Sequence, residues 1–146
     1  MLKKISKSED EWRDILTPEQ FRIMRLRKTE PPFSGEYLEI DEKGVYRCAA
    51  CGNMLFSSDA KYDSGTGWPS FFSAIDEGHV ELGIYSPHGT EVMCAVCGAH
   101  LGHVFEDGPE MTGKRYCINS TVLKLDKTAK EPARKSVGEE YYGTPG

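Results

Sequence analysis

The chain has 146 residues, of which 38% are hydrophobic and 28% charged, and its formal net charge is -5. A chain of this length holds one ordinary hydrophobic core, so we expect residues 1–146 to form a single domain. The longest apolar runs are only a few residues, which excludes a membrane helix. The net acidic charge argues against non-specific binding to nucleic acid.

The region up to residue 30 predicts two short helices. Ser8 and Glu11 have the spacing of a capping box, and apolar residues follow them at helical intervals. Residues 17–20 supply a cap, a proline at the first helical position and a glutamine three residues after the cap, so a second helix starts there. We expect the two prolines at 31–32 to end it.

The first residues include lysines, as the start of a signal peptide does. Acidic residues follow, and no apolar stretch separates them from the lysines. We therefore expect a cytoplasmic protein. In that reducing compartment, paired cysteines are more often metal ligands or redox catalysts than structural disulfides.

The body of the chain predicts mainly β structure. Short apolar or alternating runs are interrupted by glycine, asparagine, aspartate and proline, at residues 45–47, 54–56, 91–96, 103–105 and 116–125. Residues 127–146 mix charges with proline and glycine, so we expect a loosely attached tail there.

Four of the five cysteines form two C-x-x-C-G pairs, Cys48 with Cys51 and Cys94 with Cys97. Two thiolates separated by two residues can grip one cation from a tight turn, and two such turns complete a tetrahedral site. The spacing predicts one structural zinc ion that clamps two distant hairpins. The alternative is that one or both pairs are redox dithiols of the thioredoxin kind, a motif that normally occurs once and in a βαβ setting.

The fifth cysteine, Cys117, stands alone. In a strand, Arg115, Cys117 and Asn119 would share one face. A nearby guanidinium lowers a cysteine pKa, and an asparagine can hold a polar ligand, so the arrangement suits an activated nucleophile. The alternative is a small apolar residue in a β core.

Two of the four histidines, His100 and His103, follow the second cysteine pair directly and could supply a catalytic acid and base. They could equally be a second metal half-site or surface residues. His79 and His88 lie in loop-like sequence and suggest no role.

Residues 64–72, SGTGWPSFF, combine glycines with an aromatic cluster. Glycine allows the backbone to approach a ligand closely, so this loop can frame an apolar pocket. Phe71 and Phe72 are as readily explained as core residues.

Several motifs occur in an order that resembles the methionine-R-sulfoxide reductases of the B type, which repair oxidised methionine. They span residues 16–21, 32–37, 67–71, 102–105, 107–109 and 115–119. The resemblance implies two antiparallel sheets in a β-tent with a coiled-sheet core, short N-terminal helices and a zinc clip. The same scaffold serves non-enzymatic binding modules with an aromatic pocket, so such a module is the alternative function.

The resemblance also implies roles for individual residues. Cys117 would be the nucleophile, while His100 and His103 would handle protons and orient the sulfoxide. Arg115 and Asn119 would organise the site. Trp68 and Phe105 would contact the substrate, with Trp68 against its methyl group. The paired cysteines match the zinc-bearing branch of the family: Cys48, Cys51, Cys94 and Cys97.

One position departs from the pattern, because many members carry a resolving cysteine where this chain has Thr66. We therefore expect a sulfenic acid on Cys117 that thioredoxin or a small thiol reduces directly. The expected substrate is methionine-R-sulfoxide in oxidised proteins, with the free amino acid left open. A single site needs no second subunit, so we expect a monomer.

Overall fold

The structure, a computed structural model, describes residues 2–129. It begins with two helices, α1 (Glu9–Ile15) and α2 (Pro18–Met24). Both carry the predicted capping boxes, because the hydroxyl of Ser8 accepts from the Glu11 N–H and that of Thr17 accepts from the Gln20 N–H. Neither helix is long and apolar enough to cross a membrane, and none other in the described residues is either.

Helix α2 ends at Met24, so the prediction that the prolines at 31–32 end it was wrong. The apolar face of α2 consists of Phe21, Ile23 and Met24, all buried. The next apolar residue, Leu26, is 47% exposed, so a longer helix would bury little more. Arg27 then takes a left-handed conformation with φ 62, which turns the chain out of the helix.

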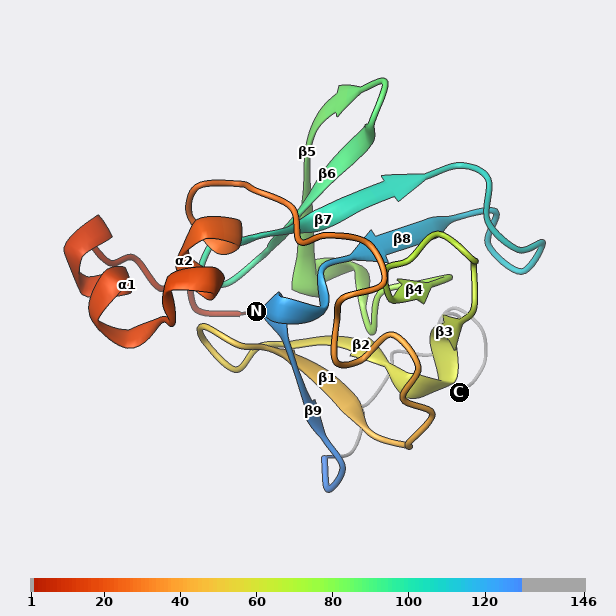
Figure 1. The fold of residues 1–146 in the computed structure, drawn as a ribbon, viewed down its shortest axis with the longest axis horizontal. Coiled ribbons are helices and arrows are strands. Elements are labelled where there is room, and N and C mark those ends of the chain that lie inside the picture. The colour runs from red at the N-terminus through yellow and green to blue at the C-terminus, as the bar shows by residue number, and fades with distance from the viewer. Residues whose placement is uncertain (1, 130–146) are drawn as a thin grey trace.

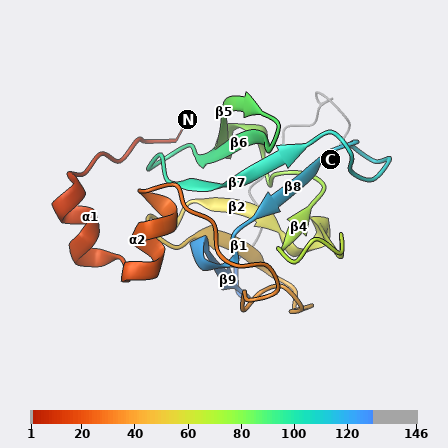
Figure 2. The same cartoon turned by 45° about the horizontal axis from the view of Figure 1, so that its top comes forward.

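The described strands form two antiparallel sheets, as predicted, with 3₁₀ turns η1 (Ser58–Ala60), η2 (Glu77–His79) and η3 (Ser120–Val122) between some of them. The smaller sheet has the order β2-β1-β9, from β1 (Val45–Cys48), β2 (Met54–Ser57) and β9 (Leu123–Asp126). The larger has the order β3-β4-β8-β7-β6-β5, from β3 (Lys61–Tyr62), β4 (Ser70–Phe71), β5 (Val80–Ser86), β6 (Gly89–Cys94), β7 (His100–Phe105) and β8 (Arg115–Ile118). Figures 1 and 2 show these sheets with the two helices at one end.

The run predicted at 116–125 is not one strand. It divides into β8 and β9, which belong to different sheets, and η3 forms the corner between them. Glu30 stabilises this corner, because its buried carboxylate accepts hydrogen bonds from the backbone N–H groups of Ser120 and Thr121 at 2.8 and 2.9 Å. The strand therefore ends at Ile118, one residue before Asn119.

Aromatic side chains from both sheets meet in the core. Phe56 of the smaller sheet stacks on Phe71 of the larger one with ring centroids 4.4 Å apart. Tyr46 meets the same Phe71 ring edge-on at 5.4 Å, and Tyr116 of β8 packs against Phe56. Phe71 is thus a core residue, which fits the simpler of its two sequence interpretations.

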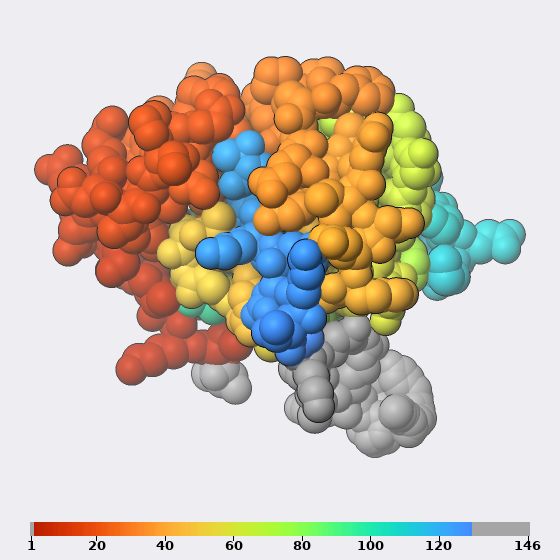
Figure 3. All heavy atoms as spheres, turned by 60° about the horizontal axis from the view of Figure 1, so that its bottom comes forward, coloured from red at the N-terminus to blue at the C-terminus, as the bar shows by residue number. Residues whose placement is uncertain are grey.

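The segment between α2 and β1 runs over the outside of the molecule and lies beside the C-terminal strand, as the orange and blue atoms of Figure 3 show. Its Tyr37 hydroxyl accepts from the Leu125 N–H, and its Glu42 pairs with Lys127. Most of the predicted loose tail, from residue 130 onward, lies outside the described residues.

Candidate active site

Cys117 lies on β8, between β4 and β7. Its Cα partner on β7 is His103, and its partner on β4 is Ser70. Residues directly opposite each other in an antiparallel pair have Cβ atoms about 5 Å apart, on the same face of the sheet. The next pair on that face is Phe105 with Arg115. Register alone therefore brings together four of the residues singled out in the sequence.

A pocket of about 450 Å³ opens at Cys117. Five of the seven residues predicted to act in catalysis or substrate binding line it, namely Cys117, His103, Asn119, Trp68 and Phe105. Thr29, Ser86 and His88, for which the sequence suggested no role, line it as well. The two remaining predicted residues, His100 and Arg115, lie outside this lining.

Burial raises the pKa of the Cys117 thiol above its ordinary value. The Thr66 hydroxyl, whose Oγ1 lies 3.8 Å from Sγ, and the Arg115 guanidinium both lower the pKa, but by less. The guanidinium thus lowers the pKa of the thiol, as the sequence suggested, but burial has the larger effect. The raised pKa favours the protonated thiol.

Arg115 is fixed by two neighbours. Its Nε and Nη2 donate to the two carboxylate oxygens of Asp107 at 2.8 and 3.1 Å. The guanidinium carbon also lies 4.2 Å from the centre of the Phe105 ring. Arg115 thus packs on Phe105, which lines the pocket, and places a positive charge near Cys117.

His103 is the imidazole opposite Cys117 across β7 and β8, and it lines the same pocket. Burial, followed by the neighbouring His100, lowers its pKa, so its imidazole is neutral at neutral pH and able to accept a proton. The two histidine rings meet edge-on with centroids 5.4 Å apart.

His100 is held behind His103 by a buried carboxylate. Its Nδ1 donates to Glu91 Oε2 at 2.8 Å, and Arg27 pairs with the other oxygen of Glu91. His100 Nε2 is buried with no hydrogen-bond partner among residues 2–129. His100 thus lies against His103 and outside the pocket lining.

The side-chain amide of Asn119 forms hydrogen bonds with backbone groups. Its Oδ1 accepts from the Glu30 N–H and its Nδ2 donates to the Leu101 carbonyl, each at 3.0 Å. The carbonyl of the same Glu30 accepts from Trp68 Nε1 at 3.1 Å. One backbone segment thus fixes both side chains, and Asn119 lies at the corner after β8 instead of sharing a strand face with Cys117.

His88 reaches the pocket through the two-residue turn between β5 and β6. Its N–H donates to the Ser86 hydroxyl, which itself donates to the Gly89 carbonyl. Gly89 packs so closely on the Phe105 ring that a Cβ there would lie 2.9 Å from it. No local sequence pattern indicates that His88 or Glu30 belongs to the site, because their positions depend on contacts with distant segments.

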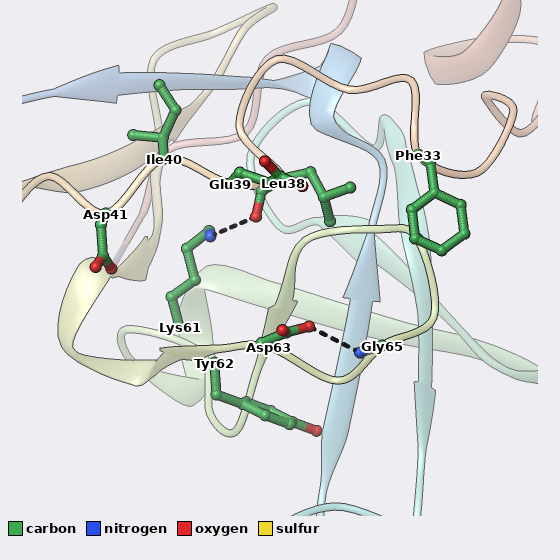
Figure 4. Close-up of a pocket in the computed structure, with 10 residues that line it drawn as sticks. Phe33, Leu38, Glu39, Ile40, Asp41, Lys61, Tyr62, Asp63 and Gly65 are labelled. Carbon is green, nitrogen blue, oxygen red and sulfur yellow. Dashed lines mark hydrogen bonds between the residues drawn. The ribbon is translucent and has the colours of Figure 1, made fainter.

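A second cavity of about 450 Å³ is lined in part by Gly65 and Gly67, from the loop at residues 64–72 (Figure 4). Its lining includes the carboxylates of Glu39, Asp41 and Asp63. Two of its polar groups are engaged within the fold: Lys61 Nζ donates to the Leu38 carbonyl, and Asp63 accepts from the Gly65 N–H. It is lined by no cysteine or histidine, so the reactive groups belong to the Cys117 pocket.

The four paired cysteines come together, as predicted. Their sulfur atoms all lie within 4.8 Å of one another. Contacts join the two pairs, at 3.8 Å between Cys48 and Cys97 and 3.6 Å between Cys51 and Cys94. Tetrahedral thiolates about 2.3 Å from one metal ion would be about 3.8 Å apart. The cluster therefore fits one metal ion better than two separate dithiols.

The glycine after each pair permits the tight turn. Gly52 and Gly98 have φ values of 86 and 77, which favour glycine, and their N–H groups donate to the carbonyls of Cys48 and Cys94. Nothing lies within 4 Å of a Cβ at either position, so backbone conformation rather than space requires glycine.

The chain's relatives are oxidoreductases, and the cysteine pocket suits such a protein. The SelR domain family matches residues 16–127 of the chain. The chain therefore belongs to this family, the methionine-R-sulfoxide reductases of the B type, and the resemblance drawn from its motifs is confirmed.

Individual relatives support this family assignment. A protein of Methanosarcina mazei is 55% identical over 134 residues, which cover 88% of this chain and 96% of the relative. One of Pseudomonas paraeruginosa is 58% identical over 127 residues, covering 85% and 96%. One of Leptospira interrogans is 53% identical over 127 residues, covering 85% and 97%. Each is named peptide methionine sulfoxide reductase MsrB.

Proposed function

We propose that this chain reduces methionine-R-sulfoxide in oxidised proteins to methionine, with Cys117 as the nucleophile. The observation that carries the proposal is the pairing of Cys117 with His103 across β8 and β7, inside a pocket that Trp68 and Phe105 also line. Membership of the SelR family supports it. The alternative, a non-enzymatic binding module, gives no reason for a thiol paired with an imidazole in that pocket.

The first half of the reaction moves one proton, in two transfers through His103. Neutral His103 takes the proton of the Cys117 thiol, and the thiolate attacks the sulfoxide sulfur. His103 then returns the proton to the sulfoxide oxygen. The oxygen then passes from the substrate sulfur to Cys117: a new bond joins Sγ to the protonated oxygen, while the substrate sulfur–oxygen bond and the sulfur–sulfur bond made in the attack both break. Methionine leaves as a thioether, reduced by two electrons, and Cys117 is left as a sulfenic acid, oxidised by two. One thiol and one sulfoxide thus give one sulfenic acid and one thioether.

The surrounding residues hold the sulfoxide for this attack. The Trp68 ring, fixed through its N–H, offers an apolar surface to the substrate methyl group, and Phe105 covers the side chain. Arg115 stabilises the developing thiolate and steadies Phe105. His100 and Asn119 hold His103 and the corner after β8 in place.

The second half of the cycle uses external thiols. Thr66, at the position of the resolving cysteine in many family members, places a hydroxyl 3.8 Å from Cys117 and offers no thiol there. The sulfenic acid condenses with one thiol of thioredoxin or a small-molecule reductant, releasing water and leaving a mixed disulfide. A second thiol releases Cys117 as the free thiol. The chain works as a monomer in this scheme.

We also propose that Cys48, Cys51, Cys94 and Cys97 hold one zinc ion. Four thiolates close the tetrahedral sphere, as in structural zinc sites, and leave no position for substrate. The ion would supply stability. Its ligands would be withdrawn from disulfide exchange, which leaves Cys117 as the reactive thiol.

The proposal is tested by the intact mass of the reduced protein after one equivalent of methionine-R-sulfoxide, with dimedone present and no reductant. We expect a dimedone adduct that peptide mapping places on Cys117. Loss of two hydrogens would keep the reductase activity but restore an internal resolving thiol. An unchanged mass would contradict the proposed reaction, and the S epimer serves as the matched control.

A further inference from the structure

An exposed apolar surface lies on β5, outside the catalytic pocket. Leu82, Ile84 and Tyr85 lie within four consecutive residues, and their side chains are 56%, 74% and 80% exposed. We call these three side chains the β5 apolar edge. Single exposed apolar residues are ordinary on protein surfaces, but a contiguous group of large ones marks an interaction site.

The backbone at this surface is also open. β5 is the last strand of the larger sheet, and in residues 2–129 no strand pairs with its outer side. Figure 1 shows the β5–β6 hairpin projecting beyond the body of the molecule. The charged residue of β5, Glu81, is paired with Lys4, so the remaining part of the strand is uncharged. An exposed edge of this kind accepts an extended, apolar segment.

The β5 apolar edge leads directly into the catalytic pocket. Ser86, the last residue of β5, lines the pocket together with His88 of the turn. The turn is held against the pocket wall, because Gly89 packs on the Phe105 ring. A strand rises about 3.4 Å per residue, so Ile84 lies about 7 Å along β5 from Ser86. The register shifts between Leu82 and Tyr85, which pair with Val92 and Thr90, so these two side chains lie on the sheet face opposite His103 and Cys117. Successive residues of an extended chain face opposite sides, so residues at odd separations from a methionine sulfoxide in the pocket would face Leu82 and Tyr85.

We propose that the β5 apolar edge binds the apolar residues that flank methionine sulfoxide in an extended segment of an oxidised, unfolded protein. The proposal rests on the function proposed above and adds the surface that recognises the polypeptide. Methionine is mostly a core residue with apolar neighbours, and its oxidation disrupts packing. The segments that present methionine sulfoxide are therefore extended and apolar, which matches an uncharged, open edge.

The test compares two substrates in the same assay with dithiothreitol as reductant. One is N-acetyl-methionine-R-sulfoxide, which has no flanking residues. The other is an unstructured peptide with one methionine-R-sulfoxide between leucines and valines. In the triple variant Leu82→Ser, Ile84→Ser, Tyr85→Ser we expect kcat/KM for the peptide to fall about tenfold or more, through KM, and for the amino acid to stay within about twofold.

A matched control removes exposed apolar residues elsewhere. Ile15→Ser with Leu26→Ser changes side chains that are 56% and 47% exposed at the helical end of the molecule. We expect this variant to treat both substrates as the unchanged protein does. Thermal unfolding of all three proteins verifies that the hairpin variant keeps its fold.

Several outcomes would overturn the proposal. An equal loss for both substrates would mean that the hairpin only supports the pocket, and no loss for either would mean that the edge binds no peptide. If light scattering shows a dimer that the triple variant dissociates, a second copy of the chain covers the edge. Failure of the unchanged protein to reduce either substrate would instead refute the proposed function.

Discussion

The groups around Cys117 shift the pKa of its thiol in different directions. Burial favours the protonated form, while the Arg115 guanidinium and the Thr66 hydroxyl favour the thiolate. His103, opposite on β7, is neutral and able to take the proton. Burial is the largest of these effects, so the pKa of the thiol is raised overall.

Replacing the nucleophile should abolish turnover without harming the fold. In Cys117→Ser we expect activity to fall about a thousandfold or more, because a hydroxyl does not replace a thiol as nucleophile or accept the oxygen. Metal content and thermal unfolding should stay close to those of the unchanged protein. Retained activity would show that another group attacks the sulfoxide.

A thiol at position 66 should restore an internal resolving step. Since Thr66 Oγ1 already lies 3.8 Å from Cys117 Sγ, the Thr66→Cys sulfur would be within reach of the sulfenic acid. We expect one equivalent of sulfoxide to remove two hydrogens from the mass of this variant, with little dimedone adduct. Thr66→Ser is the control and should keep the adduct; a persistent adduct in Thr66→Cys would contradict the geometry.

The raised pKa of Cys117 predicts the pH dependence of its alkylation. Burial disfavours the thiolate, so less of it is present at a given pH in the folded than in the unfolded protein. The iodoacetamide rate, followed by peptide mapping, should therefore level off at a higher pH in the folded protein than in urea. Levelling at a lower pH would mean that Arg115 outweighs burial.

Among the elements, the segment after α2 is what assembles the pocket. The backbone of Glu30 binds both Trp68 and Asn119, and its carboxylate binds the η3 corner. A single residue thus joins the aromatic wall of the pocket to the end of β8. The segment has no regular secondary structure, so its position depends on these hydrogen bonds.

Removing the Glu30 carboxylate should destabilise the fold and loosen the pocket. In Glu30→Ala the N–H groups of Ser120 and Thr121 lose their acceptor, and we expect the free energy of unfolding to fall by about 2–4 kcal/mol. KM for the sulfoxide should rise as well. Urea unfolding measures the first effect, with the exposed Glu36→Ala as control, and equal midpoints for the two variants would contradict this role.

For the whole molecule, the cysteine cluster joins the two sheets. Cys48 ends β1 of the smaller sheet, and Cys94 ends β6 of the larger one. A metal ion bound by both would hold the sheets together at one end, while the aromatic core holds them in between. The pocket lies on the larger sheet, so the metal would affect catalysis through the fold.

Loss of the metal should therefore unfold the protein. In Cys94→Ser we expect no bound zinc and no cooperative thermal transition, because a structural zinc site contributes about 10–16 kcal/mol of binding free energy to folding. Metal analysis and near-ultraviolet circular dichroism measure both effects. A folded, active and zinc-free variant would show that the cluster is dispensable.

The sequence alone determined the features that depend on neighbouring residues. Both capping boxes, the two C-x-x-C-G turns and the apolar runs of most strands follow from spacings of a few positions. The ordered motifs were sufficient for the family, because each motif is local and their order is read directly from the chain.

Only the tertiary structure decided what depends on contacts between distant segments. The register of β7 and β8 set His103 opposite Cys117, and the η3 corner removed Asn119 from the strand. Burial decided the protonation of Cys117, and the β5–β6 turn brought His88 to the pocket. A residue's local pattern contains neither strand register nor depth of burial, because both arise when separate segments pack together.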